Sequence, residues 1–158
     1  MSNRNPLLEN QLFYVDEVDF ESRNAIADSV IRLIHRNYSD PCLRFEDAAR
    51  RFGISVWHLS RLFKKHTGIC SKQYLKKLRM HKSESLLQAS EMGIKEAANA
   101  VGYSHVSNFN KHFKSVYRIS PGEYRRRWTL FRAERGEQDL PRIARFTKRK
   151  QDLPKNIY

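Results

Sequence analysis

Apolar residues recur every three or four positions along much of the chain, which is the spacing of helices that bury one face. The first such pattern follows Ser22, a residue able to cap a helix, and ends before Ser39-Asp40-Pro41, where proline stops it. Its apolar face comprises Ile26, Ala27, Val30, Leu33 and Ile34. No stretch of the sequence shows the sustained alternation of apolar and polar residues that is typical of strands. The pattern therefore predicts an all-α fold.

Two short helices are expected next, over about residues 46–52 and 56–66, with a tight turn between them. Gly53 closes the first helix, because glycine adopts the left-handed backbone conformation at little cost. Ser55 is placed to cap the second helix, which ends at Gly68. The second helix carries on or near one face Trp57, Leu59, Leu62 and Phe63. This is the pattern of two helices packed across a turn.

The same pattern recurs about 50 residues further along the chain, beyond a long helix expected over about residues 71–89. Ala48-Ala49 and Gly53 reappear 49 residues later, and beyond the glycine a single-residue insertion makes the offset 50. The matched pairs are Ala48-Ala49 with Ala97-Ala98, Gly53 with Gly102, Leu59 with Phe109, Phe63 with Phe113, Lys64 with Lys114, and Tyr74 with Tyr124. Two copies of a helix-turn-helix unit joined by a helix form a DNA-reading architecture, whereas a solenoid needs three or more copies.

The repeat divides the chain into two units and two extensions, with seven helices as the expected count. The expected parts are an N-terminal extension 1–21, a first helix-turn-helix subdomain with its linker helix 22–89, a second subdomain 90–130, and a basic C-terminal extension 131–158. Both extensions are expected to be extended or partly disordered. Leu130 and Phe131 can nevertheless prolong the last helix.

The formal net charge of +13 and the isoelectric point near 10.0 favour a polyanionic partner, most often nucleic acid and next a membrane surface. Residues 43–128 hold eighteen basic and six acidic residues, so the excess lies mainly on the expected folded part. No apolar run approaches the roughly 20 residues that span a bilayer, and the first residues lack the apolar core of a signal peptide. A cytoplasmic protein without a membrane partner is expected.

The sequence offers little catalytic or metal-binding chemistry. Cys42 and Cys70 are far apart and lack the close Cys/His spacing of a zinc site, so both are expected to be free thiols. Four histidines are expected to be polar surface or phosphate-facing residues: His58, His66, His105 and His112. There is no phosphate-binding glycine loop, nucleophile elbow or metal-ligand pair. We therefore expect no enzyme activity, metal or cofactor.

Several segments together resemble the signature of the AraC/XylS family. They are residues 55–68, Ala97-Ala98-x-x-Val101-Gly102-Tyr103, Phe109-x-x-x-Phe113-Lys114 and Ser120-Pro121-x-x-Tyr124-Arg125. The resemblance covers about residues 24–128. It implies a bacterial transcription regulator, usually an activator, whose two recognition helices enter successive major grooves on one face of the duplex. Compact members of the family bind asymmetric sites as monomers and contact RNA polymerase.

The resemblance also implies which residues contact DNA from the second helix of each unit, over about residues 56–66 and 105–117. The base-contacting positions that match the family are Trp57, Ser60 and Arg61 in the first helix and Val106, Ser107, Asn108, Asn110 and Lys111 in the second. Arginine can bind guanine through two hydrogen bonds, asparagine can bind adenine, and an apolar side chain can contact a thymine methyl group. Phosphate contacts are expected from Lys64, Lys65 and Lys114.

A structural role is the alternative for some of these residues. Trp57 can belong to the core, Arg61 can be a solvated helix arginine, and Val106 can pack against its own turn. The lysines of the helix over 71–89 fit either ordinary solvated charge or a field that faces phosphates.

At the level of function, the alternative is a basic architectural or RNA-binding protein without sequence preference. The ordered repeat of turn glycines and polar groove-facing residues argues against it. About 21 residues precede the first expected helix, too few to enclose a small-molecule pocket, so no effector is expected.

Overall fold

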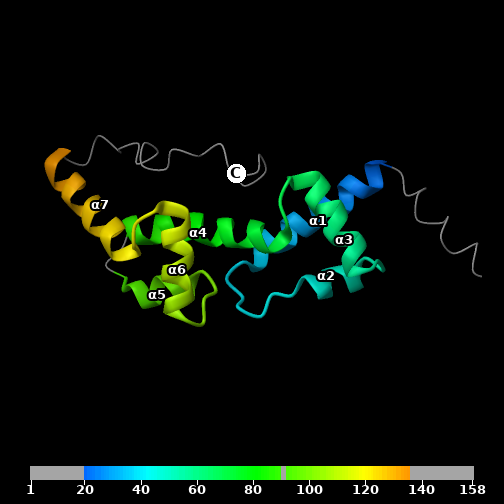
Figure 1. The fold of residues 1–158 in the computed structure, drawn as a ribbon, viewed down its shortest axis with the longest axis horizontal. Helices are drawn as coiled ribbons and strands as arrows, with labels where there is room; N and C mark the ends of the chain where they lie inside the picture. The colour runs from blue at the N-terminus through cyan, green and yellow to red at the C-terminus, as the bar shows by residue number, and fades with distance from the viewer. Residues whose placement is uncertain (1–19, 90–91, 136–158) are drawn as a thin grey trace, which may run out of the picture.

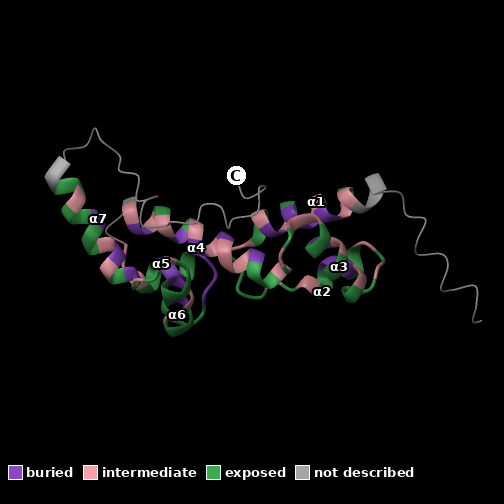
Figure 2. Ribbon diagram, turned by 45° about the horizontal axis from the view of Figure 1, so that its top comes forward, coloured by how far each residue is buried: buried purple, intermediate pink, exposed green. Residues whose placement is uncertain are grey.

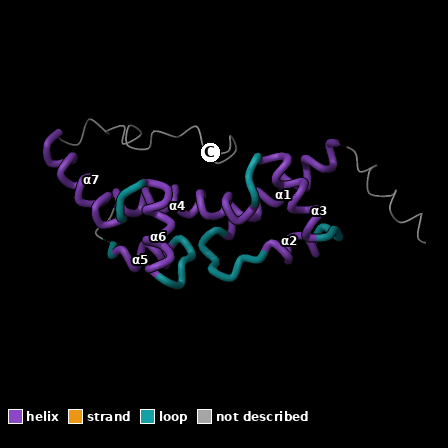
Figure 3. The backbone as a smooth tube through the Cα atoms, viewed as in Figure 1, coloured by secondary structure: helices purple, strands orange, loops and turns teal. Residues whose placement is uncertain are grey.

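The computed structural model describes residues 20–89 and 92–135, and within these ranges the chain forms seven helices and no strand (Figures 1 and 3). The helices are α1 (Phe20–Asn37), α2 (Phe45–Arg51), α3 (Val56–Thr67), α4 (Ser71–Ala89), α5 (Ile94–Ala100), α6 (Val106–Tyr117) and α7 (Pro121–Arg135). The expected all-α architecture of two helix-turn-helix units and a linker helix is confirmed.

The first unit consists of α1, α2 and α3 packed on the beginning of α4. Its core is apolar, as the helical periodicity predicts, because each helix contributes the stripe that recurs every three or four residues. The buried core residues are Val30, Ile31, Ile34, Ala48, Ala49, Leu59, Phe63, Tyr74 and Leu78.

The second unit consists of α5, α6 and α7 packed on the end of α4, and it has a core of its own. Its buried core residues are Met80, Leu87, Ala97, Ala98, Val101, Tyr103, Phe109, Phe113 and Tyr124. The apolar pairs matched by the repeat occupy corresponding places in the two cores, namely Ala48-Ala49 with Ala97-Ala98, Leu59 with Phe109, Phe63 with Phe113, and Tyr74 with Tyr124. The linker helix α4 therefore belongs to both units, with the change of unit falling between Leu78 and Met80.

Glycines make the turns that the sequence predicts. Gly53 and Gly102 have φ angles of 65° and 85°, so both helix-turn-helix turns pass through the left-handed region that favours glycine. The Ser55 hydroxyl accepts a hydrogen bond from the His58 backbone N–H at 3.1 Å, which confirms Ser55 as the cap of α3.

The ends of the fold differ slightly from the expectation. Ser22 lies inside α1 and does not cap it, because the helix already begins at Phe20 and no proline or glycine between them interrupts it. At the other end, α7 continues through Arg135, so Leu130 and Phe131 do prolong the last helix. The remainder of the two expected extensions lies outside the described residues.

In Figure 1, α2 and α5 lie below α4, and α3 and α6 rise from that side past the level of α4. Figure 2 also shows α5 and α6 below α4. Both second helices also run the same way in Figure 1, from an N-terminus far from α4 toward α4. Among the described residues, no helix is long and apolar enough to cross a membrane.

Candidate nucleic-acid interface

The second helix of each unit is held by aromatic and aliphatic residues on one face. Leu59 and Phe63 of α3 are fully buried, and so are Phe109 and Phe113 of α6. Anchoring through positions four residues apart fixes one side of each helix against its core and leaves the opposite side outward. Most of the residues that the sequence assigns to DNA lie on these outward sides.

The outward face of α3 carries a stacked pair. The Trp57 side chain is 65% exposed, so Trp57 is not a core residue. The guanidinium carbon of Arg61 lies 4.8 Å from the centre of the Trp57 ring, within the range of a cation–π contact. This contact restricts the Arg61 side chain while leaving it at the surface. The remaining expected contact residues of α3 are also exposed, namely Ser60, Lys64 and Lys65.

The outward face of α6 is polar and carries cations. Its exposed residues that the sequence assigns to DNA are Ser107, Asn108, Asn110, Lys111 and Lys114. Val106 is different, because it is half-buried and packs against the second core. Val106 therefore has a packing role in the second unit, whether or not it also contacts a base.

The repeat places corresponding residues of α3 and α6 at the same helical positions. With the 50-residue offset, Arg61 corresponds to Lys111 and Lys64 to Lys114, while Trp57 corresponds to Ser107. Each helix therefore presents cations at the same two positions. The chemistry at the first of them differs, because the planar guanidinium binds with two parallel donors and the lysine ammonium acts as a point charge.

The histidines do not all face outward as expected. His105 is exposed, but His66 turns toward α1, with Nε2 2.9 Å from the Asp28 carboxylate and Nδ1 3.3 Å from the Asn24 side-chain oxygen. His112 Nδ1 is hydrogen-bonded to the Tyr103 hydroxyl at 2.8 Å. His66 and His112 are half-exposed and have partners within the protein, because polar groups close to the core are usually hydrogen-bonded.

Two cations of α4, Lys76 and Arg79, add positive charge beside His112 of α6. Burial lowers the pKa of His112, and the charges of Lys76, Lys111 and Arg79 lower it further. Burial also raises the pKa of Tyr103 to about 12, although nearby Arg79 opposes the rise. The ring of His112 is therefore neutral at pH 7. For Lys76, the interaction with His112 favours a contribution to the positive field beside α6 over ordinary solvated charge.

Arg79 is the residue that the sequence interpretation missed. It lies at the middle of α4, between the residues of the two cores, and bonds to the loop before α2. Its partners are backbone carbonyl groups about 40 residues away, and no sequence pattern marks such partners.

The structure also bears on metal binding and thiol chemistry. In the described ranges, no group of three or more His, Cys, Asp or Glu side chains is placed to hold a metal ion. Cys42 and Cys70 are exposed free thiols, as expected.

A family model described as a helix-turn-helix domain matches residues 48–127. The Msm operon regulatory protein of Streptococcus mutans is 33% identical over 105 residues, which are 66% of this chain and 37% of that protein. The regulatory protein PocR of Salmonella typhimurium is 36% identical over 95 residues, 60% of this chain and 31% of that protein. The chain thus spans about a third of the length of these relatives.

Solved structures share the fold. The C-terminal domain of AraT, a response regulator of Geobacillus stearothermophilus, is 34% identical with a TM-score of 0.63, and the match covers 65% of this chain and 84% of that one. A transcriptional regulator of Chromobacterium violaceum with an AraC-type DNA-binding domain is 27% identical, with a TM-score of 0.58 and coverage of 75% and 96%. The DNA-binding domain of AdpA, solved in complex with a target DNA, is 25% identical, with a TM-score of 0.61 and coverage of 71% and 96%.

Proposed function

This chain belongs to the helix-turn-helix family of AraC-type DNA-binding transcription regulators, and from this premise we propose that it reads one asymmetric DNA site as a monomer. In this proposal α3 and α6 enter two successive major grooves on one face of the duplex. The major groove is about 12 Å wide and admits one helix.

The observation that carries the proposal is the matched pair of outward faces on α3 and α6. Both helices bury two aromatic or aliphatic residues, expose polar and cationic residues, and begin on the same side of α4 in Figure 1. Successive major grooves on one face of a duplex lie about 34 Å apart, which is one helical turn. The proposed site therefore holds two short elements whose centres are about 10 base pairs apart.

Each helix is proposed to combine base contacts with phosphate contacts. In α3, Arg61 would bind guanine, supported by its stacking on exposed Trp57. In α6, Asn108 or Asn110 would bind adenine through its amide. Lys64, Lys65 and Lys114 would bind phosphates, which add affinity and register without identifying bases.

Further parts of the proposal rest on the family. By similarity to its compact members, we propose an activator that contacts RNA polymerase and acts in the bacterial cytoplasm at the nucleoid. The expectation that no small-molecule effector controls it stays a prediction.

Selection of bound sequences from a random DNA pool tests the proposal. We expect two conserved elements about one turn apart, bound by one chain and favoured over random DNA by roughly 10³-fold or more at fixed salt. Binding without a recovered motif would favour the architectural or RNA-binding alternative. A palindromic site bound by two chains at the lowest protein concentration would contradict the monomer.

A further inference from the structure

The loop between α1 and α2 belongs to the first unit but is bonded to the middle of α4. Arg79 donates from Nε to the Tyr38 carbonyl oxygen and from Nη2 to the Asp40 carbonyl oxygen, both at 2.7 Å. A planar guanidinium that spans two carbonyl groups fixes direction as well as distance, which a single donor does not. The loop is thereby held in one position on the linker helix.

The same loop lies directly against the turn of the second unit. A Cβ atom added to Gly102 would lie 2.8 Å from the Tyr38 carbonyl oxygen and 2.9 Å from that of Ser39, closer than real Cβ contacts allow. The guanidinium of Arg79 also lies over the ring of Tyr103, 5.4 Å from its centre. Nη2 of Arg79 lies 2.8 Å from the same added Cβ atom, so the loop backbone, the turn backbone and the Arg79 side chain meet at this point.

Tyr38 adds an apolar link, because its side chain packs against both the first and the second core. We call Tyr38, Ser39, Asp40, Arg79 and Gly102 the junction. The corresponding turn glycine of the first unit, Gly53, has nothing within 4 Å of an added Cβ. The close approach is thus a property of the junction and not of helix-turn-helix turns in general.

Without the junction, α4 would be the main connection between the units. α3 packs on its first part and α5, α6 and α7 on its last part. Long helices curve gently and can bend where no packing constrains them. Arg79 lies between these two parts, where a bend would change the angle between α3 and α6.

We propose that the junction fixes the separation and angle of α3 and α6, and so determines how many base pairs the protein accepts between its two DNA elements. Arg79 is then a positioning residue for spacer length and does not itself contact DNA. The inference rests on the proposed function. One added base pair shifts an element by about 3.4 Å and turns it by roughly 35°, which a rigid pair of recognition helices does not follow.

The first test measures affinity for the selected site and for sites whose spacer is one base pair longer or shorter. We expect the wild type to favour the selected spacer by about tenfold or more, equivalent to about 1.4 kcal/mol. Arg79→Ala should reduce this preference to less than about threefold, equivalent to roughly 0.6 kcal/mol. It should leave the effect of a base change inside either element as in the wild type. Arg79→Lys keeps the charge but loses the planar guanidinium, so its spacer preference should lie between those of the wild type and Arg79→Ala. An unchanged spacer preference in folded Arg79→Ala would overturn the proposal.

The two turn glycines supply a matched pair of variants. Gly53→Ala and Gly102→Ala place the same methyl group in the same left-handed conformation, and both are strained by it. Only Gly102→Ala presses against the loop of the other unit. Spacer preference should change in Gly102→Ala and stay within about twofold of the wild type in Gly53→Ala, equivalent to roughly 0.4 kcal/mol. Equal changes in both variants would contradict the junction.

A measurement without DNA separates the failure of this inference from failure of the proposed function. Residual dipolar couplings of the backbone amides report the orientation of α2–α3 relative to α5–α6 in solution. One alignment tensor should fit both pairs in the wild type, and two different tensors should be needed in Arg79→Ala. A single tensor for both pairs in Arg79→Ala would overturn the inference, whereas absence of any preferred DNA sequence in the wild type would overturn the proposed function alone.

Discussion

Arg61 and Lys64 are both exposed cations of α3, three residues apart, but their surroundings differ. The guanidinium of Arg61 stacks on the Trp57 ring, in the N-terminal half of the helix that points toward base edges in known complexes. Lys64 lies in the last turn of α3, where a flexible ammonium is suited to a phosphate. The two residues should therefore contribute differently to DNA binding.

Replacing each of them with alanine separates base reading from phosphate binding. Arg61→Ala should cost about 1–3 kcal/mol on the selected site and blur the preference at one or two base positions. Lys64→Ala should weaken selected and random DNA about equally and lower the salt slope by about one unit. Binding titrations with both DNAs at several salt concentrations measure these effects. Equal losses on both DNAs for Arg61→Ala would contradict its role as a base reader.

Arg118 adopts a backbone conformation that suits glycine. It follows α6 with a φ of 65°, and among the described residues it is the one non-glycine residue with positive φ. Its counterpart after α3 is Gly68, with a φ of 78°. The left-handed conformation costs a side-chain-bearing residue roughly 1–2 kcal/mol, part of which glycine offsets by its greater freedom in the unfolded chain.

Arg118→Gly should therefore raise the free energy of unfolding by about 1 kcal/mol, measured by urea denaturation without DNA. Gly68→Ala is the reciprocal variant and should lower it by a similar amount. A lower stability of Arg118→Gly would mean that the arginine side chain contributes more than its backbone strain costs.

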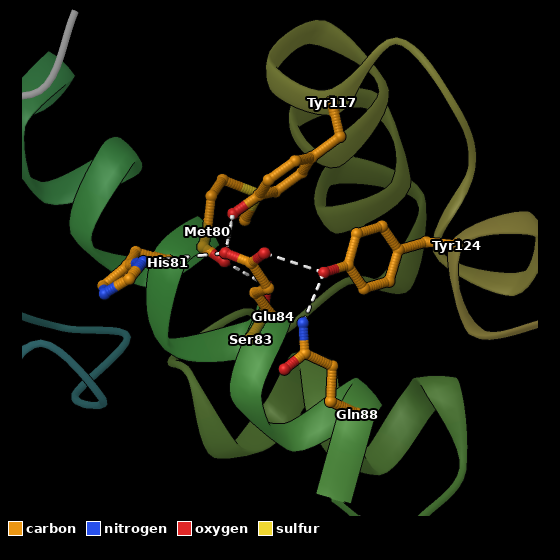
Figure 4. Close-up of polar contacts among 7 residues, drawn as sticks. All are labelled: Met80, His81, Ser83, Glu84, Gln88, Tyr117 and Tyr124. Atoms are coloured by element: carbon orange, nitrogen blue, oxygen red, sulfur yellow. Dashed lines mark hydrogen bonds and ion pairs between the residues drawn. The ribbon is translucent and has the colours of Figure 1, made fainter. Parts of the chain in front are cut away.

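Among the elements, α4 and α7 are joined by a polar cluster around Glu84 (Figure 4). Tyr124 donates to Glu84 Oε1 at 2.7 Å, Tyr117 donates to Oε2 at 3.2 Å, and Gln88 donates to the Tyr124 oxygen at 2.7 Å. Burial raises the pKa of Glu84, but hydrogen bonds from His81, Tyr124 and Tyr117 outweigh burial, so the pKa lies below its ordinary value. The carboxylate is thus charged and serves as the shared acceptor for α6 and α7.

Glu84→Leu should lower the free energy of unfolding by about 1–3 kcal/mol, because the Tyr124 hydroxyl loses its acceptor in a partly buried place and the Tyr117 hydroxyl keeps only the Met80 carbonyl oxygen, at 3.2 Å. Glu84→Gln keeps an acceptor oxygen and should cost less. Glu46→Gln on exposed α2 is the control and should change stability by no more than about 0.5 kcal/mol. Equal stabilities of Glu84→Leu and the control would show that the cluster does not hold the helices.

The helices and their cores could be predicted from the sequence because their signals are local. Apolar spacing and turn glycines place α2, α3, α4 and α6 within one residue of their observed bounds. The repeat supports these predictions, because each pattern occurs in both units. The contacts of Glu84 and Arg79 could not be predicted, since their partners lie 33 to 41 residues away and depend on how whole helices meet. The left-handed conformation of Arg118 could not be predicted either, because no glycine stands at this position. Exposure of Arg61 was foreseen, but its stacking on Trp57 was not.

Across the whole molecule, each unit contains a histidine bonded to a core tyrosine. His35 Nε2 lies 3.0 Å from the Tyr74 hydroxyl in the first unit, and His112 Nδ1 lies 2.8 Å from the Tyr103 hydroxyl in the second. Burial, followed by the charge of Lys82, lowers the pKa of His35, as burial and neighbouring cations lower that of His112. Both units therefore favour the neutral ring.

This arrangement makes the stability of the molecule depend on pH in one direction. A histidine whose pKa is lower folded than unfolded binds more protons in the unfolded chain, so the free energy of unfolding falls as pH drops below about 6.5. Glu84 lowers the stability only when the pH falls below the ordinary glutamate pKa of 4.5, so its effect lies at lower pH than that of the histidines. Urea denaturation between pH 8 and about 5.5 should show the histidine effect, and His35→Gln and His112→Gln should each flatten it. Because the two rings lie in different units, the double variant should flatten the pH dependence further than either single variant. A wild-type stability that rises toward pH 5.5 would contradict neutral rings in the folded state.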